Sequence, residues 1–318
     1  FHPWVGDADI RQFFSLLQSD GYNPLVVEQM TFTCPAPTAA AAAVAETDRP
    51  AALALLQKQF SPGALAMAAE HWQFAQGNAD AFVQDVLAHA DCEPNASFGE
   101  GYWTDHWTYD LDLIESYLAV WPENEERLFC TQSLPWYETK ALVLPRSARY
   151  QPTPEGLRPR RFLDIARKAG SKTKWMRIGD GKGEVATSTL LEKLVLLCAI
   201  KYATLDPAGI GIEMEGGKPG WYDALNGLPG LLGSSVAESC ELARLLAFTA
   251  ATLEKLGTPV VLYTEMADLL QSLAALDDAL PPYSRWDAAN TIKENYRAAT
   301  ADGVAGARTT LPAAALWV

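Results

Sequence analysis

Apolar residues recur at a spacing near 3.6 residues along most of this chain, whereas strict two-residue alternation is scarce. Because that period places apolar side chains on one face of a helix, it predicts a mostly helical protein. Hydrophobic residues are 49% and charged residues 20% of the chain, which excludes a wholly disordered or collagenous protein. The predicted helices cover about residues 8–19, 50–59, 63–76, 78–90, 109–120, 160–169, 187–203, 235–256, 263–274 and 286–300.

Two of these helices have well-defined first turns. Thr189 precedes Glu192 by three residues, and Ser235 precedes Glu238 by three residues, which is the spacing of a capping box. Residues 190–202 are apolar almost all round, so they predict an inner helix. The later helix carries one apolar stripe and predicts an outer helix; its stripe is Leu242, Leu245, Leu246 and Leu253.

The chain is predicted to be a single helical domain over residues 1–318. Residues 35–50 are rich in alanine and proline, and they predict a linker or poorly ordered loop within it. Long loops at 91–108 and 206–233 are rich in glycine, tryptophan and acidic residues, and loops of that length usually carry function. The start at Phe1 lacks an initiator methionine and a signal pattern, which predicts a fragment of a longer protein.

Charge and cysteine content restrict the partners. The formal charge of -14 repels nucleic acid and anionic membranes, so neither is an expected partner. No apolar run approaches the length of about 18 residues that a membrane span needs. The five cysteines are scattered without a Cys-x-x-Cys pair, which favours reduced thiols and a cytoplasmic location. The four histidines lack close spacing, so no metal site is expected.

Residues 213–230 form the most unusual segment. Glycines and prolines there require close turns, while three carboxylates and two aromatic side chains project from the segment. Trp221 beside Asp223 and Asn226 suits a sugar, because pyranose rings stack on aromatic faces and their hydroxyls need polar partners. A glycine-rich connection with solvated acids is the structural alternative.

Residues 99–112 form a second polar and aromatic segment. Four aromatic residues, three aspartates and a histidine fall within it, which indicates an aromatic-lined pocket. The chain has no Gly-x-Ser-x-Gly elbow, phosphate-cradling Gly-Lys-Ser loop or dinucleotide fingerprint.

Residues 146–177 form a basic segment with ten basic and two acidic residues. This segment either attracts an anion or, as the simpler interpretation, pairs with acidic neighbours.

The run Gly220-Trp221-Tyr222-Asp223-Ala224-Leu225-Asn226 resembles the general-acid loop of inverting glycoside phosphorylases of the cellobiose-phosphorylase kind (glycoside hydrolase family 94), at its Trp, Asp and Asn positions. Upstream, Tyr102-Trp103-Thr104-Asp105 resembles the Trp-Arg-Asp element that lines the donor-sugar subsite in that family. The resemblance covers about residues 95–250 and implies a complete or incomplete (α/α)6 toroid-like barrel. Thr104 and Tyr222 depart from the family pattern.

The resemblance implies inverting phosphorolysis of a β-linked oligosaccharide to a sugar 1-phosphate, with Asp223 as general acid. Inorganic phosphate is then the co-substrate, and no other cofactor is expected. The residues expected to bind the saccharide are Trp103, Asp105, Trp221, Asn226 and Glu215. A homo-oligomer is one open option.

Two alternatives remain at this stage. An inverting hydrolase on the same fold needs a second carboxylate to activate water, and that residue would be one of Glu213, Glu215, Asp105 and Asp110. An inactive glycan-binding remnant would retain the aromatic loops, and the departures at Thr104 and Tyr222 support it.

Overall fold

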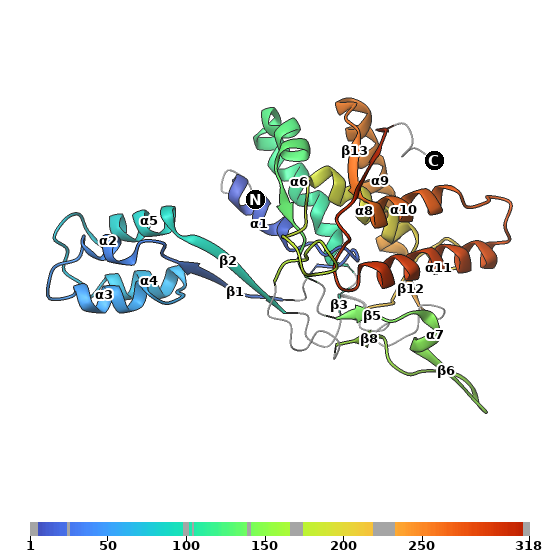
Figure 1. Ribbon diagram of the computed structural model, residues 1–318, viewed down its shortest axis with the longest axis horizontal. Helices are drawn as coiled ribbons and strands as arrows, with labels where there is room; N and C mark the ends of the chain where they lie inside the picture. Colours follow the sequence, from blue (N-terminus) through green and yellow to red (C-terminus); the bar gives the residue numbers. More distant parts are fainter. Residues whose placement is uncertain are drawn as a thin grey trace. The chain divides into compact units, whose positions relative to one another are not determined.

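The computed structural model describes residues 6–23, 26–97, 102–103, 105–138, 141–165, 174–218 and 233–313 (Figure 1). These residues are mostly helical with little sheet, as the apolar spacing predicts. Their contacts group them into two compact units, where the sequence predicts one domain: Phe1–Leu25 with Phe98–Val318, and Val26–Ser97. None of the described helices is long and apolar enough to cross a membrane.

The unit Val26–Ser97 pairs two antiparallel strands with four short helices. Strands β1 (Val26–Thr33) and β2 (Asp91–Ser97) enclose in sequence α2 (Pro37–Ala41), α3 (Arg49–Leu56), α4 (Pro62–Ala69) and α5 (Ala79–His89). Ser61 caps α4 and Asn78 caps α5, because each side chain accepts a hydrogen bond from a backbone N–H of the first turn.

The alanine-rich segment 35–50 is part of this folded unit, so its interpretation as a linker is wrong. Ala41 and Val44 are almost fully buried in the apolar core of the unit, together with Leu56, Leu65 and Phe82. Alanine has no side-chain entropy to lose on burial. An alanine-rich segment is therefore as suited to close helix packing as to a loop, and local composition does not separate the two.

Six helices of nine or more residues build the other unit around one apolar core (Figure 1). They are α1 (Asp7–Ser15), α6 (Tyr109–Val120), α8 (Leu190–Tyr202), α9 (Val236–Leu256), α10 (Thr264–Ala274) and α11 (Pro282–Thr300). Helix α8 is the inner helix that its composition predicts, since nearly all of its side chains are buried. Its capping box is confirmed: Thr189 Oγ1 accepts from Glu192 N, and Glu192 Oε2 accepts from Thr189 N.

Helix α9 follows its prediction in part. Leu242, Leu245 and Leu253 are buried, but Leu246 is 39% exposed, because the buried face continues through Thr249 rather than Leu246. The capping box at Ser235 is half formed. Ser235 Oγ accepts from Glu238 N, whereas the Glu238 carboxylate accepts a hydrogen bond from Trp107 Nε1 at 3.2 Å.

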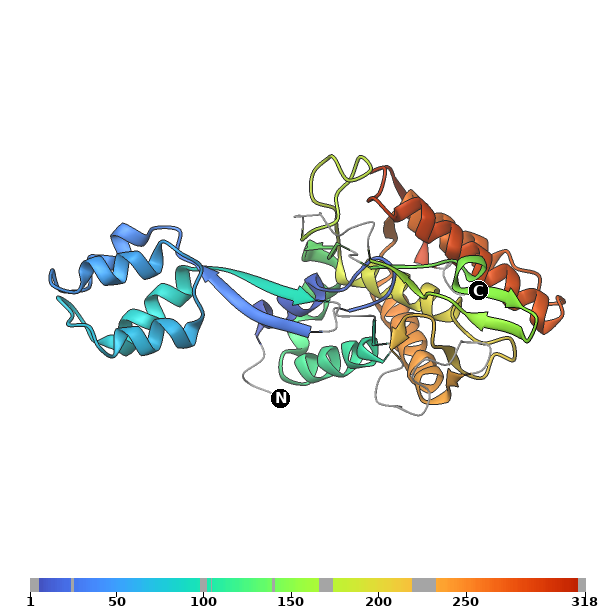
Figure 2. The same ribbon diagram turned by 90° about the horizontal axis from the view of Figure 1, so that it is seen from below.

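Paired short strands connect these helices. The pairs in the described residues are β3 (Tyr102–Trp103) with β11 (Gly217–Lys218), β4 (Leu134–Pro135) with β9 (Thr187–Ser188), β5 (Leu142–Val143) with β8 (Leu163–Asp164), β6 (Tyr150–Thr153) with β7 (Gly156–Pro159), β10 (Ile212–Glu213) with β12 (Ser234–Ser235), and β13 (Val260–Tyr263) with β14 (Arg308–Leu311). Residues of the hairpin β6–β7 (green strands in Figure 2) and of the helix over Pro282–Thr300 (red in Figure 2) line one cavity.

The helix predicted over 160–169 is wrong in its described part. Leu163 and Asp164 form β8, in which Leu163 is buried and Asp164 is half-buried; residues 166–169 lie outside the described residues. A strand of two residues is too short for its alternation to compete with a helical period in the sequence.

Candidate functional site

The described parts of the two polar and aromatic loops that the sequence singles out lie side by side. Strands β3 and β11 pair in parallel, with Tyr102 opposite Gly217 and Trp103 opposite Lys218. The resemblance implies that both loops serve one saccharide site, and their described residues are paired here. Segments more than 110 positions apart in sequence therefore present their backbones to one region of the molecule.

The predicted site residues fall into two groups. Trp221, Asp223 and Asn226 lie outside the described residues, and Trp103 is described only as a backbone position in β3. Asp105 is half-buried and precedes the short helix η1 (His106–Thr108), whose Thr108 hydroxyl donates to the Asp105 carbonyl at 2.7 Å. Glu215 is placed in full detail.

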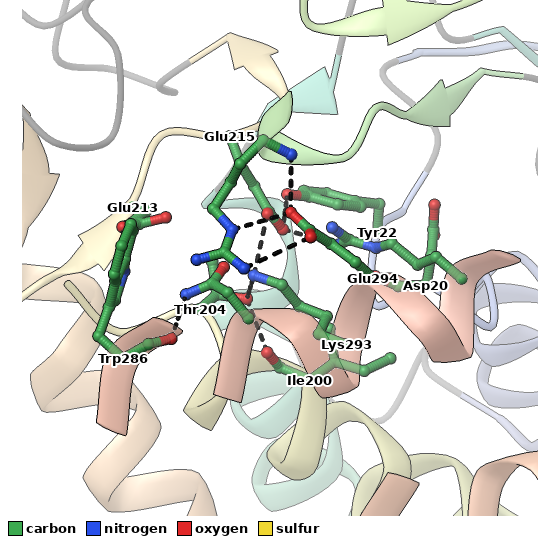
Figure 3. A network of polar contacts seen from close by, with 12 residues as sticks. Asp20, Tyr22, Ile200, Thr204, Glu213, Glu215, Trp286, Lys293 and Glu294 are labelled. Atoms are coloured by element: carbon green, nitrogen blue, oxygen red, sulfur yellow. Dashed lines mark hydrogen bonds and ion pairs between the residues drawn. The ribbon is translucent and has the colours of Figure 1, made fainter. Parts of the chain in front are cut away.

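Glu215 is the centre of a buried ion cluster (Figure 3). Its carboxylate lies 2.9 Å from Lys293 Nζ and 2.7 Å from Arg297 Nη2, and it accepts a hydrogen bond from the Tyr22 hydroxyl at 3.1 Å. The side chains of Glu215 and Lys293 are at most 1% exposed. Three segments, one of them near residue 20 and one on α11, thus meet at a single carboxylate.

The field in this cluster determines which groups carry charge. Burial would raise the pKa of Glu215, but Arg297 and Lys293 outweigh it and hold that pKa well below its usual range. Burial lowers the pKa of Lys293 to about 8, against the opposing effect of Glu215. Burial raises the pKa of Asp20 to about 6, although Arg297 and Lys201 oppose it. Glu215 is therefore a permanent buried anion.

A second buried group lies on the neighbouring helices. Burial raises the pKa of Asp110 to about 7, although Asn23 donates to its Oδ1 at 3.1 Å. Lys193 Nζ donates to the carbonyls of Phe14 and Pro135 at 2.9 and 2.8 Å, and it lies 4.0 Å from the centre of the Trp136 ring. These contacts give the Lys193 amino group polar partners inside the core, where burial lowers its pKa well below the usual range.

A cavity of about 460 Å³ lies next to Glu213, two residues before Glu215. Glu213 accepts a hydrogen bond from Trp286 Nε1 at 2.5 Å, and burial raises its pKa. The rings of Trp286 and Tyr283 have centroids 5.1 Å apart, and both line the cavity. Aromatic faces beside a carboxyl group are the surroundings that a saccharide requires.

The basic segment, residues 146–177, contributes two arginines to the lining of this cavity. Arg146 is paired as the simpler interpretation predicts, with Asp287 at 2.7 Å and Glu294 at 3.0 Å. Its guanidinium carbon lies 4.9 Å from the centre of the Trp286 ring. Arg149 also lines the cavity and is only 2% exposed. The two arginines enter the cavity from the short helix α7 (Arg146–Arg149).

Sequence reasoning did not find Tyr22, Lys293, Arg297 or Trp286 as members of this region. The sequence does mark two buried cations of α8. Lys193 and Lys201 lie in a helix that is almost entirely apolar, and a buried lysine needs polar partners. No local pattern marks the residues of α11. Within the described residues, no cluster of three or more histidine, cysteine, aspartate or glutamate side chains is arranged to hold a metal ion.

No protein-family model matches the chain, and no curated protein matches it. A functional proposal for the chain therefore depends on the chemistry of the residues described above and on the resemblance of its two loops.

Proposed function

We propose that the chain belongs to a carbohydrate-active enzyme that carries out inverting phosphorolysis of a β-linked oligosaccharide and releases a sugar 1-phosphate. The observation that carries this proposal is the pairing of β3 with β11, which brings the segment that resembles the donor-sugar element beside the residues that precede the acid-like loop in the sequence. The helical architecture is compatible with an (α/α)6 toroid-like barrel, which we include in the proposal together with a cytoplasmic location.

In the proposed reaction, Asp223 protonates the leaving glycosidic oxygen while inorganic phosphate attacks the anomeric carbon from the opposite face. The carbon–oxygen bond to the leaving sugar breaks as the bond to phosphate forms, so the configuration inverts. Because phosphate is itself the nucleophile, one carboxylic acid suffices. Trp103, Asp105, Trp221 and Asn226 are the proposed saccharide contacts, and no cofactor other than phosphate is required.

The environment of the other carboxylates bears on the alternative, an inverting hydrolase. Glu215 is held by Lys293 and Arg297, and Asp110 is completely buried, so neither is free to activate a water molecule. Glu213 lines the cavity and Asp105 is half-buried, so these two are the carboxyl groups that a hydrolase would use. Phosphate-dependent release of sugar 1-phosphate, against phosphate-independent release of free sugar, separates the two reactions.

The ion pairs of Glu215 bear on its proposed role. Lys293 and Arg297 hold its pKa well below its usual range, whereas a general acid must be protonated when substrate binds. Its ion pairs suggest instead that it fixes the backbone from which β11 and the acid loop extend. If Asp223 is not the acid, Glu213 is the next candidate, because burial raises its pKa and it lines a cavity.

The test replaces Asp223 by asparagine in the full-length protein. This change keeps the shape but removes the transferable proton, so phosphorolysis is expected to slow by a factor of about 10² to 10⁴ with little change in saccharide affinity. Asp268→Asn, at an exposed position on α10, is the matched control and should leave the rate unchanged.

Three outcomes would contradict the proposal. Near-normal phosphorolysis by Asp223→Asn would remove Asp223 as the acid. Turnover that is independent of phosphate would favour the hydrolase. Saccharide binding in calorimetry with no turnover at all would favour a glycan-binding protein.

A further inference from the structure

Tyr283 is an exposed aromatic residue on the wall of the cavity beside Glu213. It is 63% exposed, and its ring centroid lies 5.1 Å from that of the buried Trp286. The contact with Trp286 supports the Tyr283 ring without covering it. A rigid aromatic ring that remains open to solvent is a platform on which a flat apolar face of a ligand can stack.

The hairpin β6–β7 adds apolar surface to the same cavity. Leu157 and Pro152 are exposed, and both line it together with Tyr283 from the first turn of α11. Exposed apolar residues that are scattered singly need no explanation, but several of them around one cavity indicate a binding site. At about 460 Å³ the cavity lies within the range of small-molecule sites, about 300 to 1,000 Å³.

The charged groups of the cavity are compensated within the protein. Arg146 pairs with Asp287 at 2.7 Å and with Glu294 at 3.0 Å. Arg149 interacts electrostatically with Glu213. The carboxylates of the lining outnumber its arginines, so the cavity does not attract an anion, and each of these carboxylates already has a cationic neighbour. A neutral ligand can bind without displacing any of these contacts.

The same groups keep hydrogen-bonding capacity for hydroxyls. A carboxylate has about four lone-pair sites, and the exposed Asp287 uses Oδ1 for its contact with Arg146. Ser147 is exposed on α7 and adds a hydroxyl that both donates and accepts. A pyranose ring has apolar faces and hydroxyls around its rim, so it needs an aromatic platform with polar groups beside it.

We propose that this cavity binds a neutral sugar ring, with Tyr283 as the stacking platform and with Asp287 and Ser147 as partners of its hydroxyls. Tyr283 is not among the saccharide contacts of the proposed reaction, so this site is an addition to them. The inference rests on the proposed function for the choice of a β-linked oligosaccharide. The choice of a neutral sugar rests on the lining of the cavity.

Isothermal titration calorimetry of the chain with glucose tetramers tests the site. The probes are the β-1,2-, β-1,3-, β-1,4- and β-1,6-linked tetramers, the α-1,4-linked tetramer, and tetramers of glucuronate and of glucosamine as charged comparisons. We expect a neutral β-linked tetramer to bind the wild type, and we expect Tyr283→Ala to lose at least about fivefold in affinity for it.

Two further variants separate the platform from other effects. Tyr283→Phe keeps the ring and should bind within about twofold of the wild type. Trp121→Ala removes an exposed aromatic side chain that does not line this cavity, and it is the matched control, with unchanged affinity. Without ligand, Tyr283→Ala should melt close to the temperature of the wild type, because substitution of an exposed residue changes stability little.

Tyr283→Trp provides a local readout. The substitution keeps a stacking surface and adds a fluorophore at the platform, so the bound tetramer should change the emission of this variant by more than it changes that of the wild type. Equal changes in the two proteins would contradict contact between the sugar and this position. A large fall in the melting temperature of Tyr283→Ala would indicate a structural role and contradict the assignment of Tyr283 as a platform.

Failure of this proposal differs from failure of the proposed function. No binding of any neutral tetramer, or equal affinity in the wild type and Tyr283→Ala, would overturn the site. Tighter binding of the glucuronate or glucosamine tetramer would overturn its assignment to a neutral sugar. Tyr283-dependent binding of the α-linked tetramer alone, or of a β-linked tetramer without phosphorolysis, would support the site while contradicting the proposed reaction.

Discussion

Replacing Glu215 by glutamine should strongly destabilise the folded protein. The substitution keeps the shape of the side chain but leaves Lys293 and Arg297 facing each other without their shared anion, in a cluster where Glu215 and Lys293 are at most 1% exposed. Removing one partner of a buried ion pair costs about 3 to 5 kcal/mol, because the remaining charge is uncompensated. We expect a loss of that size in the free energy of unfolding.

Urea denaturation followed by tryptophan fluorescence and far-ultraviolet circular dichroism measures this loss. The midpoint should fall while the dependence on urea stays the same, which indicates a change of stability and not of compactness. The matched control is Asp112→Asn, which removes an exposed partner of Arg244 and should cost less than about 1 kcal/mol.

The double variant Glu215→Gln with Lys293→Met sharpens the test. Removing both charges eliminates most of the uncompensated charge, so the double variant should be more stable than Glu215→Gln alone. A loss by Glu215→Gln no larger than that of Asp112→Asn, or additive losses in the double variant, would refute the reasoning that the cluster depends on mutual charge compensation.

Two further predictions concern groups outside this cluster. Because the pKa of Asp110 rises from 3.8 to about 7 on folding, the folded state binds the extra proton between these values, and the stability it contributes at low pH is lost as pH rises through 7. Asp110→Asn should therefore be more stable than the wild type at pH 8, by up to roughly 4 kcal/mol, and should gain little at pH 4. Urea denaturation at several pH values measures this difference in stability, and a difference that does not change with pH would contradict the reasoning. Gly303→Ala should lower the free energy of unfolding by about 1 to 3 kcal/mol more than Gly209→Ala does. Both glycines have positive φ, but only at Gly303 would a Cβ collide with a neighbouring carbonyl, that of Arg177. Equal melting temperatures of the two variants would contradict this.

The sequence by itself determined most of the helices and the start of α8. The apolar period that marks residues 109–120, 235–256 and 263–274 is a relation between residues three or four positions apart, so it survives in the folded protein. The capping box of Thr189 and Glu192 is equally local. The meeting of β3 and β11 agrees with the family resemblance of the two loops, but no local pattern in either segment determines it.

Only the tertiary structure decided which polar groups are buried and with what they pair. Glu238 has the spacing of a capping-box residue, yet it bonds to Trp107, which lies 131 positions earlier. The sequence places Glu215 among the expected saccharide contacts, whereas in the folded protein Tyr22 and Lys293 enclose it. The free energy of a buried charge depends on its surroundings in three dimensions, and those come from residues whose separation in the chain leaves no periodic trace in the sequence.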